Sequence, residues 1–291
     1  MAEPSQHFYE SQRLRLSYWA WGAGDAPPLI LMHGGRDHAR SWDRVAEAFE
    51  DDYHVIACDL RGHGDSGWAI GSVYGLTEHM FDLIALIEIV GGPVRMISHS
   101  FGGEITLLAA GLFPEKFDRI VSIEGAGARL EDNPRPLAPR RFRNWAMDVR
   151  SWEHQAERVY PTFEDTVARV RAANRSLTPE MAEHLARWGT RTVEGGYVWK
   201  FDQWVRSRPP SEMTREDLAA AWAEMRAPVL HLVGGRSHPA QARIGGRPLD
   251  EYFPDSRTIK IPNAGHWVHH DQTALAVDAI RDFFAAPPRS D

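Results

Sequence analysis

The sequence lacks several features that would assign it to particular classes of protein. It contains a single cysteine, Cys58, so an internal disulfide is excluded and an oxidising compartment is not required. No stretch approaches the roughly 20 consecutive apolar residues that a membrane span needs. Residues 1–14 have neither the basic start nor the apolar core of a secretory signal. We therefore expect a cytoplasmic protein without a membrane partner.

Positive charge is also scarce. The 33 Lys and Arg residues are outnumbered by 40 Asp and Glu residues, and the net charge is −7. Binding to a phosphate backbone requires clustered Lys and Arg. The nearest approach to such a cluster is 134–143, where prolines interrupt the arginines and acidic residues lie close by. The composition therefore disfavours nucleic acid as a partner.

The length and composition are those of a globular protein with more than a minimal core. Of the 291 residues, 43% are apolar and 25% are charged, which is an ordinary globular balance. A chain of this length suits either one α/β core with a sizeable insertion or two independent domains.

Short apolar runs alternate with helical patterns along most of the chain. The expected strands are 13–22, 28–32, 53–59, 93–97, 117–123, 228–233 and 256–261, and the expected helices are 41–49, 76–90, 104–113 and 272–284. This alternation predicts βαβ units and an α/β fold with a mostly parallel sheet.

The rhythm of strands is interrupted once, between residues 129 and 227. This stretch is rich in tryptophan and its patterns are mainly helical. We therefore expect a first part of the core at 1–128, a helical cap insertion at 129–227 and a second part of the core at 228–291.

The sharpest local motif is Ser98-His99-Ser100-Phe101-Gly102-Gly103, between an apolar strand and a helix. A serine on a tight strand-to-helix turn stands clear of the backbone, and the turn requires small residues two positions before and after it. The familiar pattern is G-x-S-x-G, and here Ser98 replaces the first glycine. Because serine is also small, we identify Ser100 as a candidate nucleophile. The alternative is an ordinary helix start.

Two further loops supply groups that a serine nucleophile needs. His33-Gly34-Gly35 follows a buried strand, and the N–H groups of Gly35 and Phe101 could form an oxyanion hole. The alternative for this loop is a flexible glycine turn.

Asn263-Ala264-Gly265-His266-Trp267 follows the last strand and offers His266 as a base. His238, His269 and His270 are other candidates, of which the last two are expected to be solvated at a helix start. We expect no metal, because the chain lacks a spaced set of ligands.

Taken in order, HGG, DLRGHGDSG, SHSFGG and GHWVHHDQ resemble the α/β-hydrolase family over nearly the whole chain. The resemblance implies an eight-stranded sheet with a helical cap inserted after strand six. It assigns the nucleophile to Ser100, the base to His266 and the oxyanion N–H groups to Gly35 and Phe101. In DLRGHGDSG, both Asp59 and Asp65 are interpreted as structural.

The acid of the triad is where the chain departs from the commonest family pattern. The loop after the seventh strand of the family, GGRSHP at 234–239, contains no carboxylate. A triad needs an anion to hold the imidazole tautomer and stabilise the imidazolium. Glu124, at the end of the preceding strand, fits the order Ser, acid, His. The alternatives are that Glu124 is a surface turn residue and that Ser237 or a water orients His266.

The sequence thus predicts a serine hydrolase that cleaves small to medium apolar esters without a cofactor. Hydrolysis of a lactone or a C–C bond is an alternative for the same triad, and a non-catalytic ligand receptor is an alternative of another class. The oligomeric state stays open. Residues expected near the substrate are His33, Gly34, Arg36, His99, Trp145, Trp199, Trp204 and Trp267.

Overall fold

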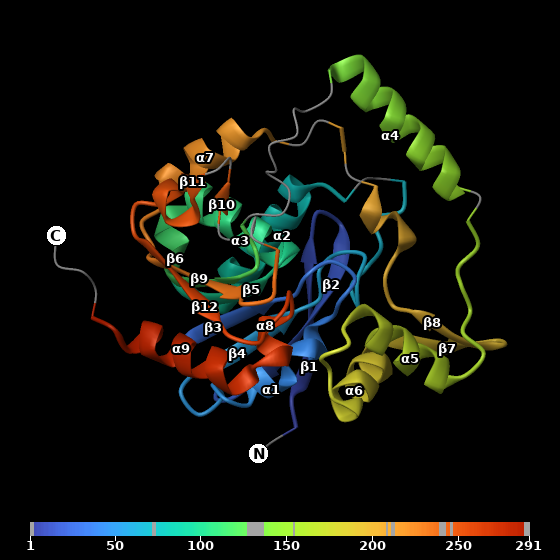
Figure 1. Cartoon of the computed structure of the whole chain (residues 1–291), viewed down its shortest axis with the longest axis horizontal. Coiled ribbons are helices and arrows are strands. Elements are labelled where there is room, and N and C mark those ends of the chain that lie inside the picture. The colour runs from blue at the N-terminus through green and yellow to red at the C-terminus, as the bar shows by residue number, and fades with distance from the viewer. Residues whose placement is uncertain are drawn as a thin grey trace.

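An eight-stranded sheet forms the centre of the protein in a computed structural model (Figure 1). The structure describes residues 3–71, 74–126, 137–153, 155–207, 209–210, 213–238, 243–244 and 247–287. The strand order is β1-β2-β4-β3-β5-β6-β9-β12. The bounds are β1 Ser5–Ser11, β2 Leu14–Trp21, β3 Pro28–Met32, β4 His54–Cys58, β5 Val94–His99, β6 Phe117–Ile123, β9 Val229–Gly234 and β12 Ser256–Ile261.

The predicted, mostly parallel sheet is confirmed. Strands β4, β3, β5, β6, β9 and β12 are parallel to one another, whereas β1 pairs antiparallel with β2, and β2 antiparallel with β4, at one edge. Sequence analysis missed β1, because most of its side chains are exposed and it shows no apolar run.

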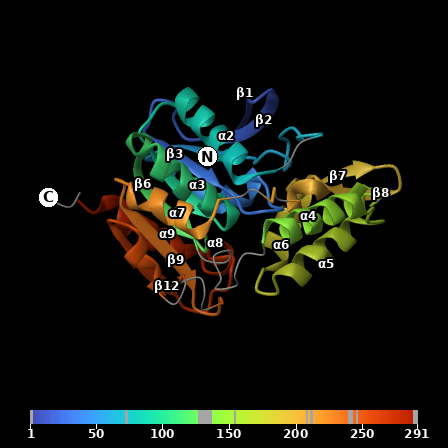
Figure 2. The ribbon, with the colours of Figure 1, turned by 90° about the horizontal axis from the view of Figure 1, so that it is seen from above.

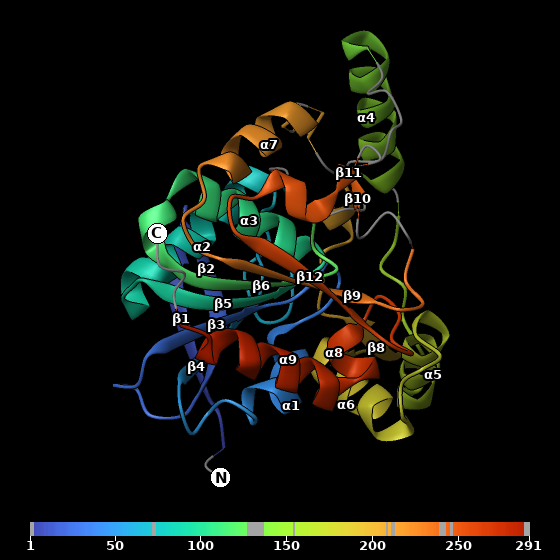
Figure 3. The same cartoon turned by 60° about the vertical axis from the view of Figure 1, so that its left-hand side comes forward.

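Helices cover both faces of the sheet (Figure 3). Alternate residues of a strand point to opposite faces, so Ile30 and Met32 belong to one apolar cluster while Leu29 and Leu31 belong to the other. The first cluster includes side chains of α2 (Leu76–Val90), α3 (Phe101–Leu112) and α7 (Arg215–Ala223). The second includes α1 (Asp43–Ala46), which follows the short helix η1 (Ala39–Trp42), and α8 (Val268–Asp271) and α9 (Thr273–Ala285). The continuous apolar runs of the sequence reflect this burial on both faces.

Most of the segment between β6 and β9 lies to one side of the sheet (Figure 2). It contains α4 (Ala138–Glu153), α5 (Phe163–Ala173), α6 (Pro179–Gly189), β7 (Thr190–Val193), β8 (Gly196–Trp199) and η3 (Gln203–Arg206). Besides the helices that the sequence predicts as the main content of 129–227, this stretch contains an antiparallel hairpin of β7 and β8 that sequence analysis did not predict. Gly195 and Gly196 make its turn with φ of 85° and 144°, values that glycine adopts most easily.

The last helix of this segment, α7, belongs to the layer over the sheet. It packs on α3, where a Cβ added to Gly111 would come within 2.2 Å of the Ala221 carbonyl oxygen. Trp222 is buried in the same apolar cluster. The predicted cap therefore includes one helix that packs with the core.

The second part of the core also contains β10 (Arg243–Ile244), β11 (Arg247–Pro248) and the short helix η5 (Leu249–Tyr252). Among the described helices, none has the length and hydropathy of a membrane span.

Candidate active site

Ser100 lies at the junction between β5 and α3, in a conformation that few residues adopt. Its φ of 49° and ψ of −117° lie in an unusual region for a residue with a side chain. Its N–H donates to the Ile123 carbonyl oxygen at 2.9 Å, which fixes the turn to the end of β6. Strain of this kind at a serine is the local signature of a nucleophile turn.

The small residues around Ser100 are required by close packing. A Cβ on Gly102 would lie 2.6 Å from two carbonyl oxygens of β3 and its following loop, those of Met32 and His33. Ser98 is tolerated in place of the usual glycine because its hydroxyl is buried and donates to the Val121 carbonyl oxygen at 3.2 Å.

A second close approach brings the end of β6 against the same turn. A Cβ on Gly103 would lie 2.6 Å from the Cα of Gly125, so the two backbones nearly touch. Gly125 directly follows Glu124, which has a φ of 54°. The two glycines therefore allow the Ser100 turn and the Glu124 turn to pack side by side.

Glu124 is a fully buried carboxylate with three polar partners. Its Oε1 accepts a hydrogen bond from the Gly234 N–H at 2.6 Å, and its Oε2 accepts one from the Ser237 hydroxyl at 2.6 Å. The Nδ1 of His266 lies 3.4 Å from the same Oε2. The interpretation of Glu124 as a surface turn residue is therefore wrong. Ser237 contacts Glu124, and it forms no hydrogen bond with His266 among the described residues.

His266 is held close to the serine turn by the residue that precedes Ser100. The Nε2 of His99 donates to the His266 carbonyl oxygen at 2.9 Å, and the centres of the two rings are 4.8 Å apart. About a third of the His266 side chain is exposed. In the described structure no hydrogen bond joins the Ser100 hydroxyl to His266. Such bonds often form only when substrate binds.

Two other histidines near this site, His99 and His269, are buried. Burial lowers the pKa of His99 and His269 well below the ordinary value, and the nearby histidines lower it further. The expectation that His269 is solvated is wrong, because His269 is buried and its ring stacks on Trp42 with a centroid distance of 4.5 Å. His270 is half-buried in the cavity wall, and burial lowers its pKa to about 3. A polar sequence at the start of a helix does not by itself make the side chains exposed, because tertiary packing can bury them.

The loop after β3 approaches Ser100 through Gly34. A Cβ on Gly34 would lie 2.8 Å from the His99 Nδ1 and 3.2 Å from the Ser100 Cβ. His33 shapes this loop, because its Nδ1 lies 2.6 Å from the Gly34 carbonyl oxygen and its Nε2 accepts the Leu60 N–H at 3.0 Å. Both contacts together require the neutral tautomer with the proton on Nδ1. Burial lowers the pKa of His33 well below its usual value, consistent with this form.

The turn after β4 is structural, as expected, but Asp65 has an additional contact. The Asp59 carboxylate accepts the N–H groups of Ala39 at 2.7 Å and Asp65 at 3.0 Å. The Asp65 carboxylate pairs with Lys200 at 2.7 Å. Asp65 therefore ties the core to the segment that follows β8.

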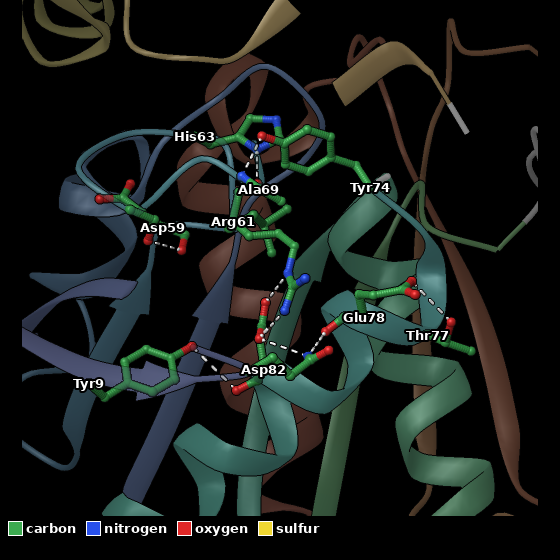
Figure 4. A network of polar contacts seen from close by, with 12 residues as sticks. Tyr9, Asp59, Arg61, His63, Ala69, Tyr74, Thr77, Glu78 and Asp82 are labelled. Atoms are coloured by element: carbon green, nitrogen blue, oxygen red, sulfur yellow. Dashed lines mark hydrogen bonds and ion pairs between the residues drawn. The ribbon is translucent and has the colours of Figure 1, made fainter. Parts of the chain in front are cut away.

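A buried polar network surrounds this turn (Figure 4). Arg61 forms two hydrogen bonds of 2.6 Å with the Asp82 carboxylate in α2. Tyr74 accepts the Ala69 N–H at 2.9 Å and donates to Asp202 at 2.5 Å. The network fixes the turn to α2 and to the chain after β8.

A cavity of about 430 Å³ lies between the core loops and the inserted segment. Core loops contribute residues 35–38, 64, 267 and 270, and the inserted segment contributes residues between 155 and 206. Of the residues expected near the substrate, Arg36, Trp199 and Trp267 line this cavity, as does Gly35. Ser100 and His266 do not line it, but Trp267 directly follows His266, and Gly35 directly follows Gly34.

The other residues expected near the substrate do not line this cavity. His33, Gly34 and His99 are buried, and Trp145 and Trp204 lie on α4 and η3 outside the lining. Sequence reasoning missed most of the wall. The missed residues are Asp37, His38, Gly64, Gln155, Ala156, Arg158, Tyr160, Arg169, Val170, Ala173, Asn174, Leu177, Leu185, Gly189, Lys200, Phe201, Gln203, Arg206 and His270. Most of them belong to the inserted segment, and that clustering is the only signal that could have suggested them.

Three of the residues near the cavity have the donor set of a divalent cation site. Ligand atoms of Asp37, His269 and His270 lie within 4.8 Å of one another. Neutral imidazole is the form that binds metals, and both histidines have lowered pKa values. These residues could hold a metal ion, although sequence analysis expected no metal.

Comparison with known proteins agrees with this architecture. The family model described as alpha/beta hydrolase fold matches residues 27–273. The chain is 26% identical over 188 residues to a serine hydrolase-like protein of Danio rerio, covering 62% of the chain and 57% of that protein, so it spans less than two thirds of this relative. It is 25% identical over 272 residues to an esterase of Mycobacterium tuberculosis, covering 91% and 85%. A solved structure of a hypothetical protein from Pseudomonas aeruginosa PAO1 matches with a TM-score of 0.85 and 26% identity, covering 97% of the chain and 99% of that protein.

Proposed function

Because the chain belongs to the alpha/beta hydrolase fold family, we propose that it is a serine hydrolase that cleaves carboxylic esters of small to medium, largely apolar substrates. The relatives named as serine hydrolase-like protein and esterase support a hydrolytic activity. In this proposal Ser100 is the nucleophile, His266 the base and Glu124 the acid.

The observation that carries the proposal is the environment of Glu124. A buried carboxylate is costly unless donors surround it, and here two donors hold it at 2.6 Å while the His266 Nδ1 lies 3.4 Å away. Glu124 then keeps the proton of His266 on Nδ1, which leaves Nε2 free to accept a proton. Ser237 replaces the usual acid of this loop by a hydroxyl that orients an acid from the neighbouring strand.

The reaction proceeds in two halves. Ser100 attacks the ester carbonyl while His266 takes its proton, and the N–H groups of Gly35 and Phe101 stabilise the oxyanion. His266 then protonates the leaving alcohol, and an acyl-enzyme remains on Ser100. A water activated by His266 attacks the acyl group and releases the acid. No cofactor enters this mechanism.

We assign the substrate to the cavity between the core loops and a cap at 129–227, of which α7 packs with the core. Val170, Leu177, Leu185 and Trp199 supply apolar wall, and a volume of about 430 Å³ suits a small molecule. Trp267 and Gly35 connect this wall to the proposed catalytic groups.

The experiment combines turnover with labelling of the nucleophile. The full chain is assayed with p-nitrophenyl esters, lactones and vinylogous diketones, and it is treated with a fluorophosphonate followed by peptide mass spectrometry. We expect ester turnover and a phosphonate adduct on the peptide that contains Ser100. If only lactones or diketones are turned over, the activity is lactone or C–C bond hydrolysis instead. Absence of both turnover and adduct would refute the proposal.

A further inference from the structure

Arginine side chains gather in the cavity of a protein that is acidic overall. Arg36, Arg158, Arg169 and Arg206 all line the cavity, whereas the whole chain carries a net charge of −7. They come from separate places: Arg36 from the loop after β3, Arg158 from the chain between α4 and α5, Arg169 from α5, and Arg206 from η3. The fold therefore brings together positive charges that the sequence keeps far apart.

Arg36 lies close enough to Arg169 and to Arg206 to be repelled by each of them. The pKa of Arg36 is lowered by burial and then by the charges of Arg206 and Arg169. Within the described part of the chain, none of these three has a carboxylate within ion-pair distance. In contrast, Lys200, the fifth cation of the wall, pairs with Asp65 at 2.7 Å. Asp37 is the only acidic residue among the described residues that line the cavity.

Other contacts hold individual arginines in place without neutralising them. The Arg206 guanidinium lies 5.4 Å from the Trp152 ring centre, and that of Arg158 lies 4.8 Å from the Tyr160 ring centre. Stacking on aromatic rings orients a guanidinium and leaves its N–H groups free to donate. Like charges held together in this way are best stabilised by an anion that binds between them.

Resting on the proposed ester hydrolysis, we propose that the substrate carries an anionic group, a carboxylate or a phosphate, which Arg36, Arg169 and Arg206 bind in the cavity while its ester lies at Ser100. Arg36 has a left-handed backbone, with a φ of 65°, and directly follows Gly35. The anion subsite is therefore linked by one peptide bond to the proposed oxyanion loop. The apolar residues of the wall contact the chain that joins the anionic group to the ester.

The test compares charged and uncharged esters of equal length. Monomethyl esters of dicarboxylic acids from succinate to suberate are assayed beside their dimethyl esters, and short acyl-coenzyme A thioesters provide the phosphate arm. We expect kcat/KM for the best charged substrate to exceed that of its uncharged counterpart by about tenfold or more, a difference of about 1.4 kcal/mol. A preference for half-esters identifies carboxylate as the anion, and a preference for the thioesters identifies phosphate.

Charge-removing variants locate the subsite. Arg169→Gln and Arg206→Gln should raise KM for the charged ester about tenfold and leave kcat/KM for the uncharged ester within about threefold, because only the anion contact is lost. Arg187→Gln is the matched control: Arg187 is exposed on α6, pairs with Glu183 at 2.6 Å and lies outside the cavity lining. It changes net charge equally and should preserve the preference.

A binding measurement separates failure of this inference from failure of the proposed function. If no ester is hydrolysed, calorimetry with glutarate and with inorganic phosphate still tests the subsite, because binding does not need Ser100. Binding by the wild-type chain and the Arg187→Gln variant, with loss in Arg169→Gln, supports the inference. Hydrolysis of uncharged esters at equal or higher kcat/KM than charged ones, or equal binding by all three proteins, would overturn it.

Discussion

The Glu124 carboxylate is buried and has defined hydrogen-bond partners, whereas Arg169 and Arg206, which the inserted segment presents to the cavity, are exposed and have no carboxylate partner among the described residues. Glu124 receives hydrogen bonds from two neighbouring loops, and His99 holds the backbone of His266. Arg169 and Arg206 extend from the inserted segment into the wall of the cavity and stay exposed. In the proposed enzyme, groups that perform chemistry are rigidly supported by the sheet, and groups that select substrate are long and adaptable.

The largest effect is expected at the proposed catalytic residues, which follow the carboxyl ends of the strands. Ser100→Ala should lower kcat for ester hydrolysis by roughly 10⁴ to 10⁶, because no other group can form the acyl-enzyme. His266→Ala should be about as damaging, since the two residues act as a unit. Circular dichroism and the unfolding midpoint should stay normal. A Ser100→Ala enzyme within tenfold of the wild type would contradict the assignment.

A smaller loss of kcat is expected at Glu124, which contacts His266 and not the substrate. Glu124→Gln should lower kcat by about 10² to 10⁴, because the amide keeps the shape but cannot stabilise the imidazolium. Glu124→Asp shortens the reach and should be intermediate.

Ser237→Ala tests whether the hydroxyl acts through Glu124. We expect a loss of about tenfold, since the Gly234 N–H still holds the carboxylate, and little further loss when Ser237→Ala is added to Glu124→Gln. A healthy Glu124→Gln enzyme beside a crippled Ser237→Ala enzyme would make Ser237 the orienting group instead.

As the pH falls, we expect the core around the sheet to lose stability before the inserted segment does. Burial lowers the pKa of His231 in β9 to about 4, against 6.5 for the unfolded chain. Its contribution to stability is therefore complete above pH 6.5 and lost as the pH falls toward 4. At about 1.4 kcal/mol per pKa unit, this one group accounts for about 3 kcal/mol of unfolding free energy.

Urea unfolding of His231→Leu between pH 7 and pH 4 measures this contribution. The variant should lose less stability over that range than the wild type, because leucine has no imidazole that takes up a proton on unfolding. His7→Gln, at an exposed histidine, is the control for loss of an imidazole. Equal acid sensitivity of wild type and His231→Leu would remove His231 from the account.

The mildest effect is expected in the wall of the cavity. Trp199→Ala should raise KM for an apolar ester by about three- to tenfold with a smaller change in kcat, because the ring supplies binding surface. Trp145→Ala, on α4 outside the cavity lining, should leave both constants within about twofold. If Trp145→Ala had the larger effect on KM, the substrate would lie elsewhere.

The sequence by itself determined the sheet and the positions of the candidate catalytic groups. Continuous apolar runs at 28–32, 117–123 and 228–233 predicted buried strands, because residues covered on both faces leave this pattern whatever lies above them. The glycines of SHSFGG marked the turn at Ser100, since close backbone packing excludes side chains there. A missing carboxylate in GGRSHP directed attention to Glu124.

Only the tertiary structure decided how those groups are supported and what surrounds the cavity. The hydrogen bond from Ser237 to Glu124 joins residues 113 positions apart, and no local pattern records it. Burial of His269 depends on packing against Trp42, so the polar sequence HHDQ was misinterpreted as solvated. The inserted segment lies against the loop after β3 and so brings Arg169 and Arg206 close to Arg36. Because these residues are far apart in the sequence, their charge repulsion follows only from the tertiary structure.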